Sequence, residues 1–331
     1  MGCCSSKETA DAGAGSETVV QNAAADADVV AVEAPVAKVD SPATKLARRV
    51  IAAALGINQR CSAEDTDEAA ARALIAEAEA LVADAAKAAE LADEEGGSDA
   101  KLLAAKAVAA AAAAAASAAA ARQRALAARR ESLRREARRE VNNVDSKILS
   151  DIAALANPAA SIVQLLSALA VALDAKVDET STAAGFQGKQ RSARAILRPL
   201  LLPNALEDAA LVLPKGSDGK GLAKLWKAHL HPMLTHVTGE DGLRVSMRRF
   251  CDKVADLSDD DLADAEKAAA LARALLRGVT DPSRLGGCWA SVHAWLGHAL
   301  SFVANEVLLR AAAEDEKLWR QTSDRTKAES D

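Results

Sequence analysis

The 331-residue chain contains no tyrosine, and aromatic residues make up only 2% of it. Glycine (17), proline (8) and runs of β-branched residues are also scarce. Strands and their turns depend on these residues, so the composition excludes an all-β protein and disfavours a doubly wound α/β enzyme. Much of the 50% hydrophobic share is alanine, which favours helices but buries little surface per residue. We therefore expect an all-α chain, partly extended and partly compact.

Signals of several functional classes are also missing. No 18-residue run predicts a membrane span, because residues 107–121 are mostly alanine. No GxxxxGK[ST] motif is present, and the sequence GSDGKG at 216–221 has the wrong spacing to cradle a phosphate. No CxxC pair or secretory signal is present, which predicts a reducing, cytosolic environment and no zinc site. The cysteines are Cys3, Cys4, Cys61, Cys251 and Cys288.

No catalytic or metal site is expected. His229, His231 and His236 lie within eight residues, but no cysteine or carboxylate completes a plausible ligand set. Cys251 and Cys288 are interpreted as small buried hydrophobic residues, since no neighbouring base is proposed that would activate either thiol. The sequence therefore predicts a protein that is not an enzyme, with no cofactor and no metal.

The first seven residues, MGCCSSK, carry the most specific signal. Loss of Met1 exposes Gly2, and Ser6 occupies the position that the N-myristoylation pattern requires. A myristoyl chain would bring Cys3 and Cys4 to the membrane, where palmitoylation of these cysteines makes the marginal attachment stable. We expect lipidation at Gly2, Cys3 and Cys4. The alternative is an ordinary disordered terminus that happens to begin with Met-Gly.

This motif resembles the start of dually acylated, membrane-targeted proteins, including several that are sorted to flagella. The resemblance implies the cytoplasmic face of a membrane, at a ciliary or flagellar site.

After the motif at 1–7, residues 8–60 are predicted to form a disordered tether with a short helix at Lys45–Leu55, because the stretch to residue 44 is rich in Ala, Asp, Glu and Ser. Residues 1–100 carry 8 basic and 19 acidic residues.

Residues 61–157 predict a helical or coiled-coil arm. Thr66 caps a first helix that ends at Gly96-Gly97, and Ser98 caps a second that runs to about Glu140. The first has apolar residues at alternating spacings of three and four, typical of a thin coiled-coil seam. These are Ala71, Leu74, Ala78, Leu81, Ala85, Ala88 and Ala92. At 1.5 Å per residue the second helix is roughly 65 Å long.

The end of the arm is basic: residues 101–160 hold 11 basic and 5 acidic residues. A basic segment in an acidic chain indicates one local acidic partner surface and no nucleic-acid binding. Its arginines form either a solvated face with i,i+4 pairs or a patch that docks on an acidic polymer or membrane. They are Arg122, Arg124, Arg129, Arg130, Arg134, Arg135, Arg138 and Arg139.

Residues 158–300 predict a helical head. A short buried helix is expected at Ser161–Leu173. Ser258 is expected to cap a further helix that begins directly after it. The apolar spacing around Trp295 predicts a last helix that continues to about Trp319. Residues 301–331 then form a returning helix and tail.

Three segments resemble the stalk and microtubule-binding tip of dynein heavy chains, in the same order. They are ILSDIAALANPAASIVQLLSALAVAL (148–173), FCDKVADLSDDDLADAEKAA (250–269) and CWASVHAWLGHALSFVANEV (288–307). The resemblance implies microtubule binding through basic side chains at the tip, because the tubulin surface is acidic. The candidates are Lys189, Arg191, Arg194, Arg244, Arg248 and Arg249. The alternative for Arg248 and Arg249 is solubility and local pairing with Asp252 and Asp256.

Two features depart from that family. The helix at 161–173 carries Gln164 but no lysine or arginine, and the returning helix is expected to end near residue 320, far shorter than the outgoing one. Most of the arm therefore lacks an in-chain partner and stays alone, folds back or self-associates. The hypothesis is a membrane-anchored adaptor that binds microtubules or another cytoskeletal partner. The alternative is an acylated helical scaffold that binds another protein and never contacts tubulin.

Overall fold

A computed structural model describes residues 40–63, 66–145, 159–173, 234, 242–277, 279, 285 and 287–330. These residues form seven α-helices and no strand, which confirms the all-α class. The chain divides into two compact units, Met1–Asp40 and Ser41–Asp331, and the helices all belong to the second.

The first helix, α1 (Pro42–Cys61), is longer than the predicted helix at Lys45–Leu55. The Ser41 side chain accepts a hydrogen bond from the backbone N–H of Thr44, and Pro42 occupies the first turn, where its missing N–H costs nothing. The helix therefore includes residues that sequence alone assigned to the end of the tether.

Local capping chemistry sets the limits of α2 (Glu68–Glu95) and α3 (Ser98–Val141). The N-cap of α2 is Asp67, whose carboxylate accepts from the Ala70 N–H, and the prediction of Thr66 was wrong by one residue. Gly96 ends α2 at φ 71°, a left-handed conformation that glycine adopts without strain. Helix α3 follows Gly97 without a side-chain cap, so the predicted capping role of Ser98 was wrong.

Helices α1, α2 and α3 pack through layers of small side chains. One layer joins Ala43, Ala92 and Ala104, the next joins Val50, Ala88 and Ala107, and a third is centred on Ile57. The order of the layers shows that α1 and α3 run in the same direction and α2 runs against them. Of the seven predicted seam positions of α2, six are buried and Leu81 is partly buried, so these positions form the buried face of the helix.

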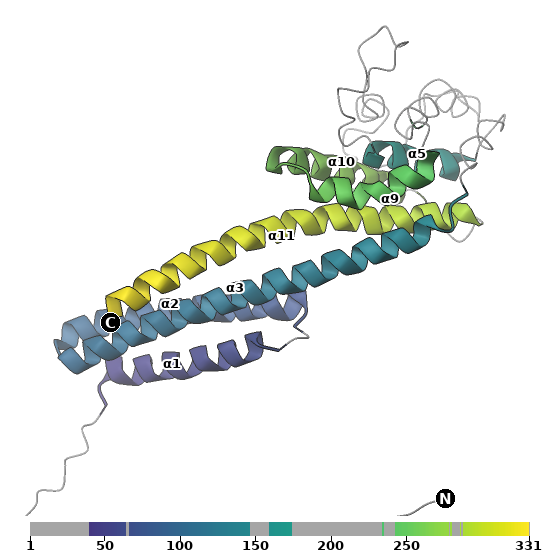
Figure 1. Cartoon of the computed structure of the whole chain (residues 1–331). Coiled ribbons are helices and arrows are strands. Elements are labelled where there is room, and N and C mark those ends of the chain that lie inside the picture. Colours follow the sequence, from purple (N-terminus) through teal and green to yellow (C-terminus); the bar gives the residue numbers. More distant parts are fainter. Residues whose placement is uncertain are drawn as a thin grey trace, which may run out of the picture. The chain divides into compact units, whose positions relative to one another are not determined.

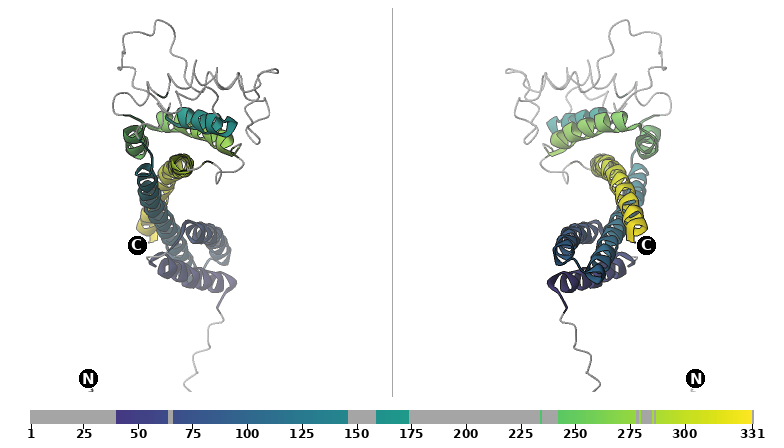
Figure 2. Two further views of the ribbon diagram at one scale, coloured as in Figure 1. Left: turned by 90° about the vertical axis from the view of Figure 1, so that its right-hand side faces the viewer. Right: turned by 90° about the vertical axis from the view of Figure 1, so that its left-hand side faces the viewer.

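Helix α11 (Cys288–Ser330) packs along α3 (Figure 1, Figure 2). It is 43 residues long against 44 for α3, so the expectation of a helix ending near residue 320 was wrong. The expectation that most of the arm lacks an in-chain partner was also wrong, because α1, α2 and α11 all pack against α3. Self-association through the arm stays a prediction.

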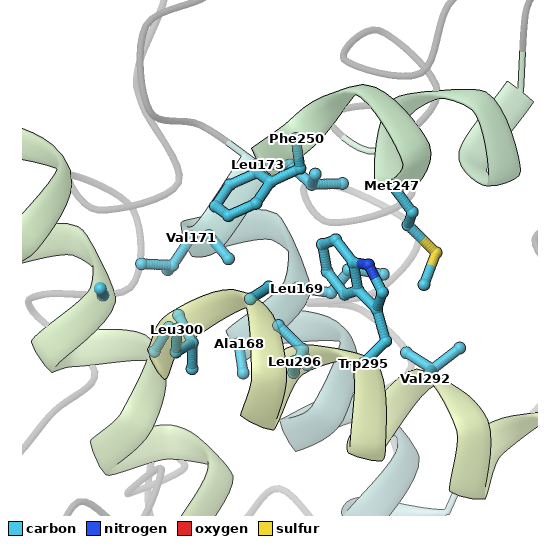
Figure 3. Close-up of a cluster of buried hydrophobic side chains, with 14 of the residues drawn as sticks. Ala168, Leu169, Val171, Leu173, Met247, Phe250, Val292, Trp295, Leu296 and Leu300 are labelled. Atoms are coloured by element: carbon cyan, nitrogen blue, oxygen red, sulfur yellow. The ribbon is translucent and has the colours of Figure 1, made fainter. Parts of the chain in front are cut away.

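Three shorter helices, α5 (Ala160–Leu173), α9 (Gly242–Ala255) and α10 (Asp259–Arg277), share one hydrophobic core with the C-terminal part of α3 and the N-terminal part of α11. As predicted, Ser258 caps α10, accepting from the Asp261 N–H. Trp295 of α11 is fully buried and meets Phe250 of α9 edge to face at 5.5 Å between ring centroids (Figure 3).

Helix α3 is also long and apolar enough to cross a membrane, with a mean hydropathy of 1.7 over its best 18-residue window. A core helix of a soluble protein passes the same test, and 44% of this window is buried within the fold. The alanines that raise the hydropathy, Ala107, Ala111 and Ala115 among them, are the residues against which α1 and α2 pack.

Candidate functional site: a basic surface at the end of α3

Most arginines of α3 bind partners on other helices. Arg129 pairs with Glu68 of α2 at 2.6 Å, and Arg122 pairs with Asp315 of α11 at 3.3 Å. Arg124 donates to the backbone carbonyl of Cys61 at the end of α1 at 2.7 Å. These arginines join the helices. They therefore form neither the predicted solvated face nor a docking patch.

Two more arginines, Arg134 and Arg138, converge on Asp252 of α9. The Asp252 carboxylate accepts from both guanidinium groups and raises the pKa of Arg134 above its ordinary value. The Asp252 carboxylate thus forms bonds between helices, and Arg248, one of the two arginines expected to pair locally, donates to another residue.

Arg244 and Arg248 meet at the C-terminal end of α3. Arg248 Nη2 donates to Asn142 Oδ1 at 2.9 Å, and Arg244 Nη2 donates to the Asn142 carbonyl at 3.4 Å. Cations are stabilised there because the last carbonyls of a helix carry partial negative charge. The structure therefore brings together Arg244 and Arg248, two of the predicted partner-binding residues. Arg249 is exposed on the same helix, α9.

Two exposed arginines of α3 extend this surface. Positions 135, 139 and 142 lie four and three residues apart, so Arg135, Arg139 and Asn142 share one helix face and lead to Arg248. We call the surface formed by Arg135, Arg139, Arg244 and Arg248 the α3–α9 basic surface. The sequence showed Arg135 and Arg139 but gave no sign that α9 lies next to them.

The remaining predicted site residues, Gly2, Cys3, Cys4, Lys189, Arg191 and Arg194, lie outside the described residues. The same holds for His229, His231 and His236.

A polar layer crosses the α3–α11 interface. Arg130 Nε lies 2.5 Å from Glu306 Oε1, and Asn305 Nδ2 donates to the Leu126 carbonyl at 3.0 Å. Glu306 is only 3% exposed, and this burial raises its pKa above the ordinary range although Arg130 and Arg310 pull the pKa down. Polar bonds at one level of an apolar interface oppose sliding of one helix along the other.

The described cysteines have the environment of structural residues. Cys61 and Cys251 are buried and free, and burial raises the pKa of the Cys251 thiol to about 12. Such a thiol stays protonated and unreactive at neutral pH. An open hollow of about 360 Å³ lies where α1 meets α2, with the Arg60–Glu77 ion pair in its lining. Within the described ranges no three potential metal ligands come together.

The chain matches no protein-family model, no curated protein and no solved structure. Its function is therefore inferred from its own residues and from how the helices arrange them.

Proposed function

We propose that the protein is a non-enzymatic adaptor that links a membrane to microtubules. Acyl chains on Gly2, Cys3 and Cys4 hold its N-terminus on the cytoplasmic face of a membrane, and a head formed by α5, α9 and α10 binds the filament. A cilium or flagellum, in which membrane and microtubules run side by side, suits such a link.

The observation that carries this proposal is the separation of the two ends. Helix α1 begins beside the start of α3, where the Ala43 N–H donates to Glu95 Oε1 and Ala43 packs with Ala100. The basic surface lies at the other end of α3, at Asn142. About 40 helical residues between these points span about 60 Å. The segment that carries the acylation motif thus joins the fold at the end opposite the α3–α9 basic surface.

The order of the helices supports the dynein-stalk resemblance. A long helix runs out as α3, short helices follow as α5, α9 and α10, and a long helix returns as α11 in one shared core. The α3–α9 basic surface is suited to the acidic face of tubulin, and an interaction of this kind weakens as salt screens the charges.

Full-length protein is expected to co-pellet with microtubules at low ionic strength and to be released by salt. The double variant Arg248→Glu with Arg249→Glu should weaken binding by about tenfold or more, because like charges across an interface repel. The matched control reverses Lys317 and Arg325, two exposed cations in the C-terminal half of α11, and should bind as wild type does. No binding of wild type at low salt, or equal losses in both double variants, would contradict the microtubule proposal.

Gly2→Ala is expected to abolish incorporation of labelled myristate and to move the protein from the membrane fraction to the soluble fraction of cells. Without myristate the cysteines do not reach the membrane-bound acyltransferase, so palmitate incorporation should fall as well. Cys3→Ser with Cys4→Ser should keep the myristate and weaken membrane attachment. Unchanged intact mass of wild type, with no acyl chain, would sink the membrane part of the proposal.

One observation favours the alternative, an acylated scaffold whose head binds another protein. Helix α5 carries no charged residue, and its side chains from Val163 to Leu173 lie in the core except for the partly buried Gln164. It therefore offers no basic contact to tubulin. Under this alternative the microtubule assay is negative while the acylation assay is positive.

A further inference from the structure

The outer face of α1 is basic in an otherwise acidic part of the chain. Residues 1–100 contain 8 basic and 19 acidic residues, yet α1 has four basic residues and no carboxylate. Half of the basic residues of this stretch therefore lie on one 20-residue helix.

Three of these charges share one side of the helix, and the fourth, Arg60, pairs with Glu77 of α2. The buried face of α1, which includes Ala47, Ala54 and Ile57, packs on α2 and α3. The opposite face is exposed and presents Lys45, Arg48, Arg49, Ala52 and Leu55 at helical spacing.

Two features of this face point to a partner. Among the described residues, the Lys45 ammonium and the Arg49 guanidinium form no ion pair, in contrast to most arginines of α3. Leu55 has 59% of its surface exposed on the same face, and is one of three large apolar side chains that are more than half exposed in the part of the chain that the structure describes. A row of cations with an exposed leucine matches the composition of helices that lie in the headgroup region of a bilayer.

We propose that the outer face of α1 docks on an anionic phospholipid surface, as a second membrane contact beside the acyl chains. The inference rests on the proposed function for the nearness of a membrane. Anionic lipids attract each nearby lysine or arginine enough to raise affinity about fivefold. Charge complementarity is the ground for choosing lipid, together with the place of α1 as the first helix after the residues that carry the acylation motif.

The packing then fixes how the fold lies on the membrane. Because α1 and α3 run side by side in the same direction, a bilayer that touches α1 along its length also lies along α3. The α3–α9 basic surface then lies farther along the same membrane surface than α1, and the long axis of the fold is parallel to the bilayer.

The test uses full-length Gly2→Ala protein, which cannot be acylated, in flotation with lipid vesicles. Vesicles with about 30% phosphatidylserine should carry the protein at about 50 mM salt, and vesicles of phosphatidylcholine alone should not. Lys45→Glu with Arg49→Glu should reduce the binding at least tenfold. The matched control, Arg72→Glu with Lys87→Glu, makes the same charge change at exposed positions of α2 and should bind as the parent does.

Equal binding to both kinds of vesicle, no binding to either, or equal losses in the two double variants would overturn the docking surface. Circular dichroism and the melting temperature of each variant show whether the fold is kept. Since the assay involves no acyl chain, its result is independent of the labelling of Gly2: a failure here leaves the acylation result intact, and a failure of acylation leaves this one intact.

Discussion

Trp295→Ala is expected to lower the free energy of unfolding by about 3–5 kcal/mol, the usual range for removal of a large aromatic residue from a core. Trp295 is fully buried and contacts Phe250 edge to face, in a cluster that joins α5, α9, α10 and α11. Natural domains are stable by only about 5–15 kcal/mol. The variant should therefore loosen the α5–α9–α10 core well before the contacts between α3 and α2 are lost.

Urea unfolding followed by far-UV circular dichroism measures this effect. Trp289→Ala is the matched control, because the same side chain six residues earlier in α11 is only partly buried and should cost clearly less. Trp295→Phe is the second control. The indole N–H of Trp295 has no acceptor among the described residues, so phenylalanine removes an unpaired donor and should recover part of the loss. Equal losses for Trp289→Ala and Trp295→Ala would show that this core does not depend on Trp295.

The features that the sequence predicted well depend on neighbours along the chain. The buried face of α2 follows from helical spacing, the end of α2 from Gly96, and the start of α10 from Ser258. Each requires only residues within one or two turns. The one-residue error at Thr66 has the same local origin, since Asp67 is also a good N-cap and its carboxylate accepts the Ala70 N–H.

The features that the sequence did not predict depend on residues far apart in the chain. Past Trp319 the helix α11 is polar and shows no apolar spacing, so sequence alone placed its end there. Trp319 packs against the α1–α2–α3 core, and Glu316 pairs with Arg320 at 2.5 Å, which supports the helix in this region. The partner of Arg122 is likewise 193 residues away. Charge alone could not show that most of these arginines bind other helices.

Breaking the Arg130–Glu306 pair should cause the second large loss of stability. Arg130→Met keeps the length of the side chain and leaves the nearly buried Glu306 carboxylate without its closest cation. Breaking a buried ion pair by removing one partner commonly costs 3–5 kcal/mol. We expect about 2–3 kcal/mol at neutral pH, because 30% of the Arg130 side chain is exposed and solvent screens part of the attraction.

This loss should depend on pH in a defined direction. Burial raises the pKa of Glu306 in the folded protein and Arg130 lowers it, so Arg130→Met raises the pKa further. A carboxyl group whose pKa is higher in the folded state carries its proton in both states at low pH. Stability then falls as the pH rises from the ordinary value of 4.5 through the folded pKa. The deficit of Arg130→Met should thus be small near about pH 4 and largest near about pH 7.

Urea unfolding of wild type and variant across this range gives the deficit directly, since other titrating groups contribute to both proteins and cancel. Adding Glu306→Gln to Arg130→Met removes the titrating carboxyl, so the double variant should lose the pH dependence and recover stability at neutral pH. A deficit that stays constant with pH would mean that Arg130 stabilises the α3–α11 interface through packing alone. A pH-dependent deficit that glutamine removes would instead show that the charge of Arg130 is what allows a carboxylate to lie between these two helices.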